Sequence, residues 1–158
     1  MADTATEGPV ELDTAFTDLV RVETRLYTAI EQRMKAATEI GAGSFELLRY
    51  VRDHQDVRVA DLAFAFAIGV GTTSKIVDRL EKQGWVERRP NPTNRRSSLL
   101  ALTAAGESVV SRAEPAWQAA LQEIFGAAVT REDLPALART LDAVRSNLER
   151  RNLGLPTG

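Results

Sequence analysis

Hydrophobic residues recur at steps of three and four along most of the chain, the spacing that places them on one face of an α-helix. The first such run predicts a long amphipathic helix over residues 11–40. It carries Leu12, Phe16 and Leu19 on its apolar face, and the two glycines at 41 and 43 end it.

Three shorter helices are predicted next. Ser44 is placed to cap the first, the second covers residues 59–67, and the third begins near Thr72 and ends at Gly84. Three short helices in a row, with a glycine-containing turn between the last two, predict a helix-turn-helix.

The pattern changes after Gly84, because residues 85–89 and 98–102 read as two short β-strands. Residues 90–97 between them contain two prolines and two asparagines, which resist helix and favour tight turns. A hairpin directly after a helix-turn-helix is a wing. Residues 44–103 therefore predict a winged helix-turn-helix lobe.

Two more helices are predicted over residues 104–151, with Thr103 as the cap of the first and Thr130 in a capping box before the second. The last helix has apolar residues at alternating steps of three and four, typical of a coiled-coil seam. These residues are Leu134, Leu137, Leu141, Val144 and Leu148. The predicted fold class is mainly α with a small β-wing, and residues 1–10 and 152–158 are expected to fray.

Charge is unevenly distributed along the chain, whose formal net charge is −2. Residues 69–103 hold seven basic and three acidic side chains, a local net charge of +4. A local basic patch matters more to a polyanion than the charge of the whole chain. Chance clustering on a solvated face is the alternative, and charge alone does not separate the two.

The sequence lacks the residues that several classes of function require. The chain has no cysteine and one histidine, His54, and carries no nucleophile motif, phosphate-binding glycine loop or metal-ligand spacing. We therefore expect no enzyme activity, no cofactor and no metal. Neither a signal peptide nor a long apolar span is evident, so a cytoplasmic protein is expected.

The order of these elements resembles the MarR family of bacterial regulators, and the resemblance covers almost the whole chain. Its most specific part is residues 68–103, above all the segment 76–86, the wing and the residues 102–106 that follow it. The family's wing typically reads Asp-Pro-x-Asp-Arg-Arg, whereas this chain has Asn91 and Asn94 in place of both acids. Since an amide offers only neutral hydrogen bonds, we expect a looser but more positive wing tip.

The resemblance implies a homodimer held by residues 11–40 and 104–151, and often a small-molecule pocket between lobe and dimer region. It also implies a sequence-specific regulator of transcription, more commonly a repressor, that binds a pseudo-palindromic operator in double-stranded DNA. The alternative function is a winged helix used only for protein contact.

Candidate DNA-binding residues follow from position in the motif. On the recognition helix they are Thr72, Thr73, Ser74, Lys75 and Arg79. In the wing they are Arg88, Arg89, Asn94, Arg95 and Arg96, of which the tip arginines suit a narrow minor groove. The alternatives are a simple helix cap for Thr72 and a solvated charged face for the basic residues.

The apolar faces of the first and last helices are the predicted dimer interface, although the last could instead pack within one chain. Tyr27, Tyr50 and Trp117 are candidates to line an effector pocket. For each of them taken singly, a role as a core or surface residue is the favoured explanation, and His54 is interpreted as a solvated residue at a helix end.

Overall fold

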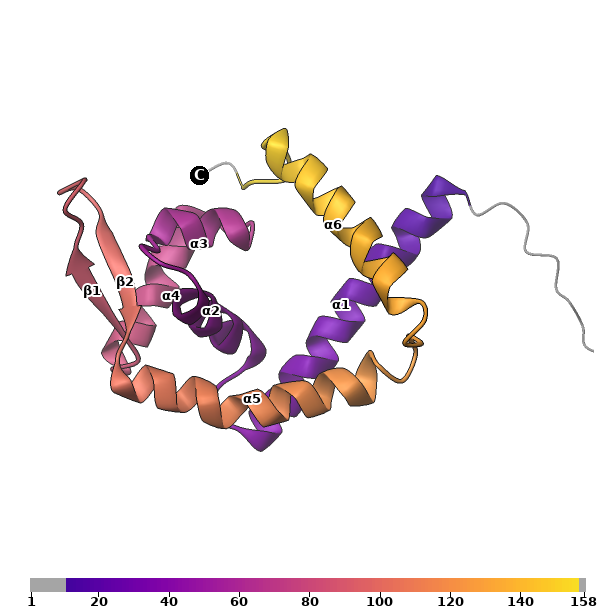
Figure 1. The fold of residues 1–158 in the computed structure, drawn as a ribbon, viewed down its shortest axis with the longest axis horizontal. Coiled ribbons are helices and arrows are strands. Elements are labelled where there is room, and N and C mark those ends of the chain that lie inside the picture. Colours follow the sequence, from indigo (N-terminus) through magenta and orange to yellow (C-terminus); the bar gives the residue numbers. More distant parts are fainter. Residues whose placement is uncertain (1–10, 157–158) are drawn as a thin grey trace, which may run out of the picture.

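The computed structural model describes residues 11–156, so the predicted tail 1–10 and residues 157–158 lie outside the described part. Within it, six helices and one antiparallel pair of strands confirm the predicted fold class (Figure 1). In chain order they are α1 (Leu12–Ala37), α2 (Ala42–Asp53), α3 (Val59–Ala65), α4 (Val70–Lys82), β1 (Val86–Pro90), β2 (Ser98–Leu102), α5 (Ala104–Ile124) and α6 (Leu134–Arg150).

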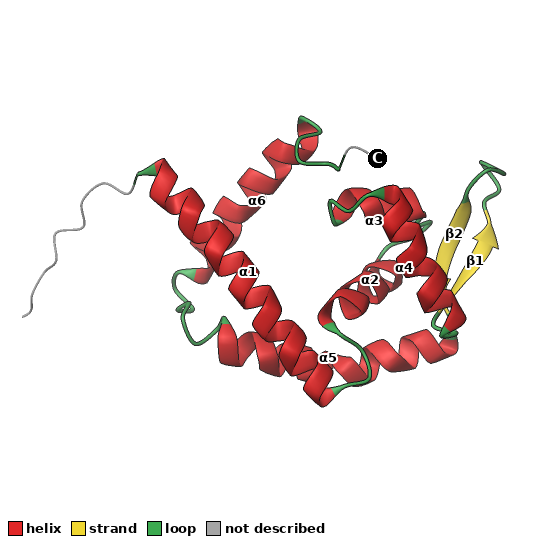
Figure 2. Ribbon diagram, turned by 180° about the vertical axis from the view of Figure 1, so that it is seen from behind, coloured by secondary structure: helices red, strands yellow, loops and turns green. Residues whose placement is uncertain are grey.

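The compact part of the chain is a lobe formed by α2, α3, α4 and the hairpin (Figure 2). Its core is built on side chains that are almost completely buried, including Phe45, Leu48, Leu62, Val77 and Leu80. Helices α3 and α4 meet at a bend of 117°, within the range of about 90–120° that a helix-turn-helix adopts. The lobe is thus a helix-turn-helix with a wing.

Two helix starts differ from the sequence prediction. Helix α2 begins at Ala42 with Gly41 as N-cap, not at Ser44, because Glu31 of α1 supplies the cap. The carboxylate of Glu31 accepts the N–H of Ala42 at 2.5 Å, so a residue distant in sequence replaces a local one. Helix α4 begins at Val70 with Gly69 as N-cap, two residues before the predicted start near Thr72, so the alternative explanation of Thr72 as a simple helix cap is wrong.

Other local signals are confirmed. Gly84 has φ +75°, the left-handed conformation expected after α4. Thr103 caps α5, since its side chain accepts the N–H of Gly106 at 3.0 Å. The capping box predicted at Thr130 is the exception: its hydroxyl accepts the N–H of Asp133 at 3.1 Å in the turn before α6, but the N-cap of α6 is Asp133.

Helix α5 connects the lobe to the rest of the molecule. Its first turn lies against the hairpin base, where Thr103 donates its N–H to the carbonyl of Trp85 at 3.1 Å. Its other end runs beside α1, to which it is tied by an ion pair of 2.7 Å between Arg33 and Glu123 (Figure 1). Helix α5 is therefore the link between wing and first helix.

Helix α6 stands apart from the lobe core, and none of its residues is buried. It ends in a Schellman arrangement, in which Leu153 N–H reaches the carbonyl of Leu148 and Asn152 N–H that of Glu149. Asn152 has φ +49° there. Residues 152–156, expected to fray, thus begin with a defined turn.

Within residues 11–156, no single helix is long and apolar enough to cross a membrane, and α3 with α4 qualifies only when the two are joined across their bend.

Candidate nucleic-acid interface

Helix α4 has a buried back and an exposed face. Thr73, Val77 and Leu80 face the core, and the hydroxyl of Thr73 donates to the carbonyl of Gly69 at 3.0 Å. Thr73 is 0% exposed, so it helps to fix the start of the helix. The expectation that it contacts DNA is contradicted by this burial.

The remaining candidates on α4 lie at or near the surface. Thr72, Lys75 and Arg79 are exposed and Ser74 is half-buried. They sit in the first ten residues of a helix whose N-terminal N–H groups and hydroxyls suit phosphate oxygens. The helix therefore offers a small polar end followed by two cations, as a groove-reading helix requires.

Two arginines at the base of the wing are held by carboxylates. Arg88 lies 2.7 Å from Asp78 and 3.3 Å from Glu81, both on α4. Arg89 pairs with Glu87 on the same strand at 2.6 Å. Arg88 thus fixes the strand against α4, a role that differs from the expected phosphate contact, whereas Arg89 remains exposed.

The wing tip is closed by its asparagines. Asn91 is 8% exposed; its Oδ1 accepts the N–H and hydroxyl of Thr93 at 3.0 and 2.8 Å, and its Nδ2 donates to Ser97 at 2.9 Å. Asn94 Oδ1 accepts the backbone N–H of Arg96 at 3.0 Å. Both amides therefore act on the turn itself, and Asn94 does not hold the guanidinium groups as envisaged for an acid at this position.

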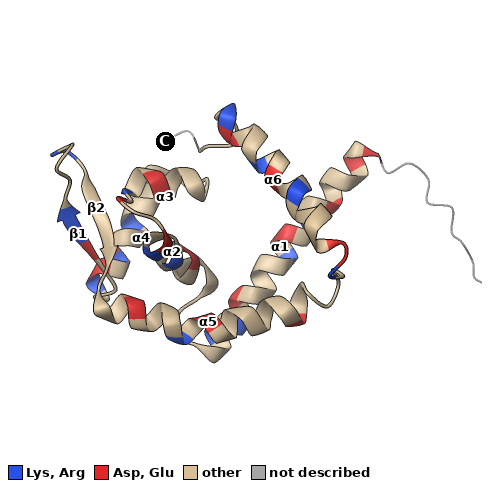
Figure 3. Cartoon of the chain, viewed as in Figure 1, with Lys and Arg blue, Asp and Glu red and all other residues tan. Residues whose placement is uncertain are grey.

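The two tip arginines, Arg95 and Arg96, are exposed. In the described part of the chain, neither guanidinium takes part in an ion pair within 4.0 Å. Figure 3 shows basic residues at the end of the hairpin, away from the acidic residues of α1 and α2. The tip thus presents two exposed positive charges on a turn that is held by its own hydrogen bonds.

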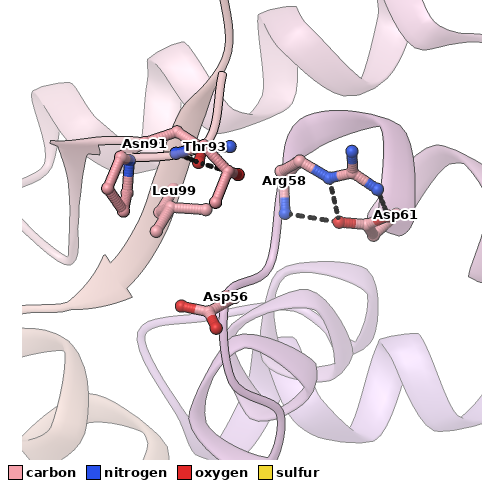
Figure 4. Close-up of a pocket in the computed structure, with 7 residues that line it drawn as sticks. Asp56, Arg58, Asp61, Asn91, Thr93 and Leu99 are labelled. Carbon is pink, nitrogen blue, oxygen red and sulfur yellow. Dashed lines mark hydrogen bonds and ion pairs between the residues drawn. The ribbon is translucent and has the colours of Figure 1, made fainter. Parts of the chain in front are cut away.

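A hollow of about 300 Å³ lies between the wing and the start of α3 (Figure 4). On one side the capping box of α3 holds Arg58 and Asp61 together, at 2.7 Å. Beneath it the N–H of Leu100 donates to the carbonyl of Val57 at 2.7 Å, so the loop before α3 pairs with the outer edge of β2. This contact orients the wing, and no local sequence pattern predicts it.

Predicted dimer residues lie outside the core of the single chain. Leu12, Phe16 and Leu19 on α1, and Leu134, Leu141, Val144 and Leu148 on α6, are all between 41 and 89% exposed, and Leu137 is half-buried. In α1 the two buried residues, Ile30 and Met34, lie in the second half. The apolar faces of α6 and of the first half of α1 are therefore uncovered.

The three candidate pocket residues do not come together. Trp117 is a core residue whose ring centre lies 5.0 Å from that of Phe45. Tyr50 stacks on His54 at 3.9 Å. Of the three, only Tyr27 lines a large cavity, of about 470 Å³. Residues of α2 and α4 line it too; none of them was a predicted pocket residue, and Arg79 was predicted as a DNA contact.

The fold and the exposed basic wing define a winged helix-turn-helix protein. Residues 40–98 match the family model described as MarR. The multiple antibiotic resistance protein MarR of Escherichia coli K12 is 32% identical over 71 residues, which are 45% of this chain and 49% of that protein. The chain spans about half the length of the curated relatives it matches.

Solved structures show the same fold over more of the chain. The Streptomyces coelicolor protein Sco3205, described as a MarR family transcriptional regulator in complex with DNA, has a TM-score of 0.81 at 23% identity, covering 98% of both chains. BpsR of Bordetella bronchiseptica, whose DNA binding is described as regulated by 6-hydroxynicotinic acid, has a TM-score of 0.73 at 23% identity, covering 87% of this chain and 97% of that one. Residues 40–98 are thus similar to the MarR family, and most of the chain shares the fold of these solved structures.

Proposed function

We propose that this chain is a DNA-binding transcriptional regulator that reads an operator with α4 and the wing. The observation that carries the proposal is the pair of exposed tip arginines, free of ion pairs in the described chain, beside a helix with a polar outer face. Arginine at a hairpin tip can enter a narrow minor groove, where the negative potential is enhanced. Bound at a promoter, the regulator would repress transcription by steric occlusion. It would act in the cytoplasm, and a small-molecule effector would relieve the repression.

Within this proposal the structure changes the roles of some residues. Thr72, Ser74, Lys75 and Arg79 contact the major groove or its phosphates, and Arg89, Arg95 and Arg96 meet the backbone and minor groove. Asn94 shapes the turn that presents the tip, and Arg88 positions β1. Thr73 is removed from the interface because it is buried.

The same proposal includes a homodimer. Residues 44–103 form the DNA-binding lobe, and residues 11–40 and 104–151 provide the dimer contacts. The support is the uncovered apolar stripe of α6, since a helix with no buried residue gains little stability from its own chain. A two-fold pair of lobes then faces two half-sites about one DNA turn apart.

The first test is fluorescence anisotropy on DNA from upstream of the chain's own gene, with a scrambled duplex as reference, at several salt concentrations. We expect Arg95→Ala to weaken operator binding about tenfold, because a charge-assisted phosphate or groove contact contributes roughly 1.5 kcal/mol. The slope of log affinity against log salt should fall by about 0.9 for each phosphate that the variant no longer neutralises.

Arg131→Ala is the matched control, since Arg131 is exposed in the turn before α6 and is neither one of the proposed DNA contacts nor one of the predicted dimer residues. It should leave affinity within about twofold, as expected for a surface charge without a partner. Unchanged affinity in Arg95→Ala would remove the wing from the interface. Binding that is weak and insensitive to salt would favour a protein-contact module.

Restoring an acid at the tip is a second test. In Asn94→Asp the carboxylate can still accept the N–H of Arg96, so thermal stability should stay within about 0.5 kcal/mol. DNA affinity should fall about threefold, because a negative charge now stands beside the tip arginines. Tighter DNA binding by Asn94→Asp would show instead that an acid organises the guanidinium groups.

A further inference from the structure

The cavity that Tyr27 lines has a mixed wall of rings, aliphatic side chains and charges. It lies between the second half of α1, the start of α2 and the side of α4, and its volume is about 470 Å³. Ligand pockets in proteins commonly enclose about 300–1,000 Å³. The cavity is thus of a size to take a small organic molecule.

Aromatic side chains line three parts of this cavity. They come from α1, from the end of α3 and from the residue before β1, and are Tyr27, Phe66 and Trp85. Ile68 and Ile76 add aliphatic surface. Aromatic faces attract cations through the ring quadrupole, and apolar walls favour an organic body over a hydrated ion.

Two of the three carboxylates in the cavity wall are already neutralised. Glu31 lies 2.8 Å from Lys35 and accepts the N–H of Ala42 at 2.5 Å. Glu39 is paired with Arg112 on α5. These two acids are held by the protein and need no further partner.

The third carboxylate, Glu46, has no ion pair within 4.0 Å in the described part of the chain. It is half-buried, and burial raises its pKa above the ordinary value despite hydrogen bonding to Tyr27 and the attraction of Arg49. Partial burial and Glu46 raise the pKa of Tyr27 to about 12. Tyr27 therefore stays neutral, so it donates a hydrogen bond but supplies no compensating positive charge.

We propose that this cavity binds an organic cation, an amine or quaternary ammonium group on an apolar body, with Glu46 as its counter-ion. The cationic group lies against the carboxylate of Glu46 beside Tyr27, and the body fills the space toward Phe66 and Trp85.

An anionic ligand beside Tyr27 would meet the uncompensated carboxylate of Glu46. The wall also holds two cations: Lys35 is paired with Glu31, whereas Arg79 of α4 is in no ion pair within 4.0 Å in the described part of the chain. The carboxylate of Glu46 and the aromatic surface beside it therefore favour the cation on the α1 and α2 side of the cavity, away from Arg79.

The cavity also adjoins the proposed DNA-reading helix. Ile76, Arg79 and Gln83 of α4 line it, opposite the α1 residues. A bound cation would therefore join α1 to α4 and influence Arg79, which is one of the proposed DNA contacts. That influence on DNA binding rests on the proposed function, whereas the binding of the cation does not.

The test measures the binding of benzyltrimethylammonium, the probe, to the protein in the absence of DNA. Binding is measured by isothermal titration calorimetry. We expect saturable binding that is at least tenfold stronger than that of phenylacetate, an anion of similar shape. Glu46→Gln should weaken probe binding at least tenfold. Glu39→Gln is the matched control, because Glu39 is already paired, and it should change the affinity by less than threefold.

The position of the probe is checked by fluorescence, since Trp85 lines the cavity and Trp117 lies in the core. The probe should change the emission of the wild type and not that of Trp85→Phe. Circular dichroism confirms that each variant is folded. Absent binding, preference for phenylacetate, or unchanged affinity in folded Glu46→Gln would each overturn the proposal, and operator binding measured separately would be unaffected by that result.

Discussion

Gly106→Ala is expected to unfold the chain at a markedly lower temperature. A Cβ built on Gly106 would lie 2.0 Å from the carbonyl oxygen of Trp85 and 2.9 Å from its carbonyl carbon. Both are backbone atoms, and Trp85 is held in place because its carbonyl accepts the N–H of Thr103. Neither backbone segment can move aside freely, so we expect the free energy of unfolding to fall by about 3 kcal/mol, as for overpacked sites.

The measurement is thermal or urea unfolding at one fixed protein concentration, because association would shift the midpoint. Gly71→Ala is the matched control: Gly71 also lies in a helix, and its Cβ would meet nothing within 4 Å. Alanine at this position should raise the free energy of unfolding by about 0.5–1 kcal/mol, because alanine has a higher helix propensity than glycine. Equal stability of Gly106→Ala and wild type would contradict the close approach of α5 to the hairpin base.

Leu141→Glu is expected to convert the proposed dimer into a monomer at micromolar concentration. Leu141 lies in the uncovered stripe of α6 and is 41% exposed in the single chain. In a two-fold dimer each chain would bury one unpaired carboxylate, at a cost of several kcal/mol. We expect the dimer dissociation constant to rise at least about 100-fold, or roughly 3 kcal/mol.

Sedimentation velocity over a range of concentrations measures this change directly. Ala143→Glu provides the control, because Ala143 is exposed on the other side of α6 and receives the same new charge. It should stay dimeric, and both variants should keep the wild-type far-ultraviolet circular dichroism. A wild type that sediments as a monomer would contradict the dimer and the two-half-site operator together.

The elements of the fold could be predicted because they rest on local patterns. The apolar spacing of α1 and α6, the glycine that ends α4 and the threonine that caps α5 are each encoded within a few residues. The wing could be predicted for the same reason, since its turn is made by its own asparagines. Such signals act within one or two turns of chain.

The parts that sequence reasoning missed depend on pairs far apart in the chain. Ser44 is a good local cap, yet Glu31 takes its place from another helix. Arg88 reads as a phosphate-binding residue until Asp78 and Glu81 are seen beside it. Glu46 is unremarkable in sequence, and its environment becomes evident only once α1 and α4 enclose it.

The seating of α5 on the hairpin base gives the molecule a mechanical property. Helix α5 has 21 residues, so it is about 30 Å long, and its first turn cannot slide past Trp85 without a backbone clash. It is therefore clamped to the wing at this end. Pro115 lies in the middle of α5 and cannot donate a backbone hydrogen bond, so the helix can bend there. The part of α5 before Pro115 is about 16 Å long, so a tilt of about 0.1 radian at the proline would carry the wing about 1.6 Å. The wing thus moves as one body with the first half of α5, and the second half stays with α1.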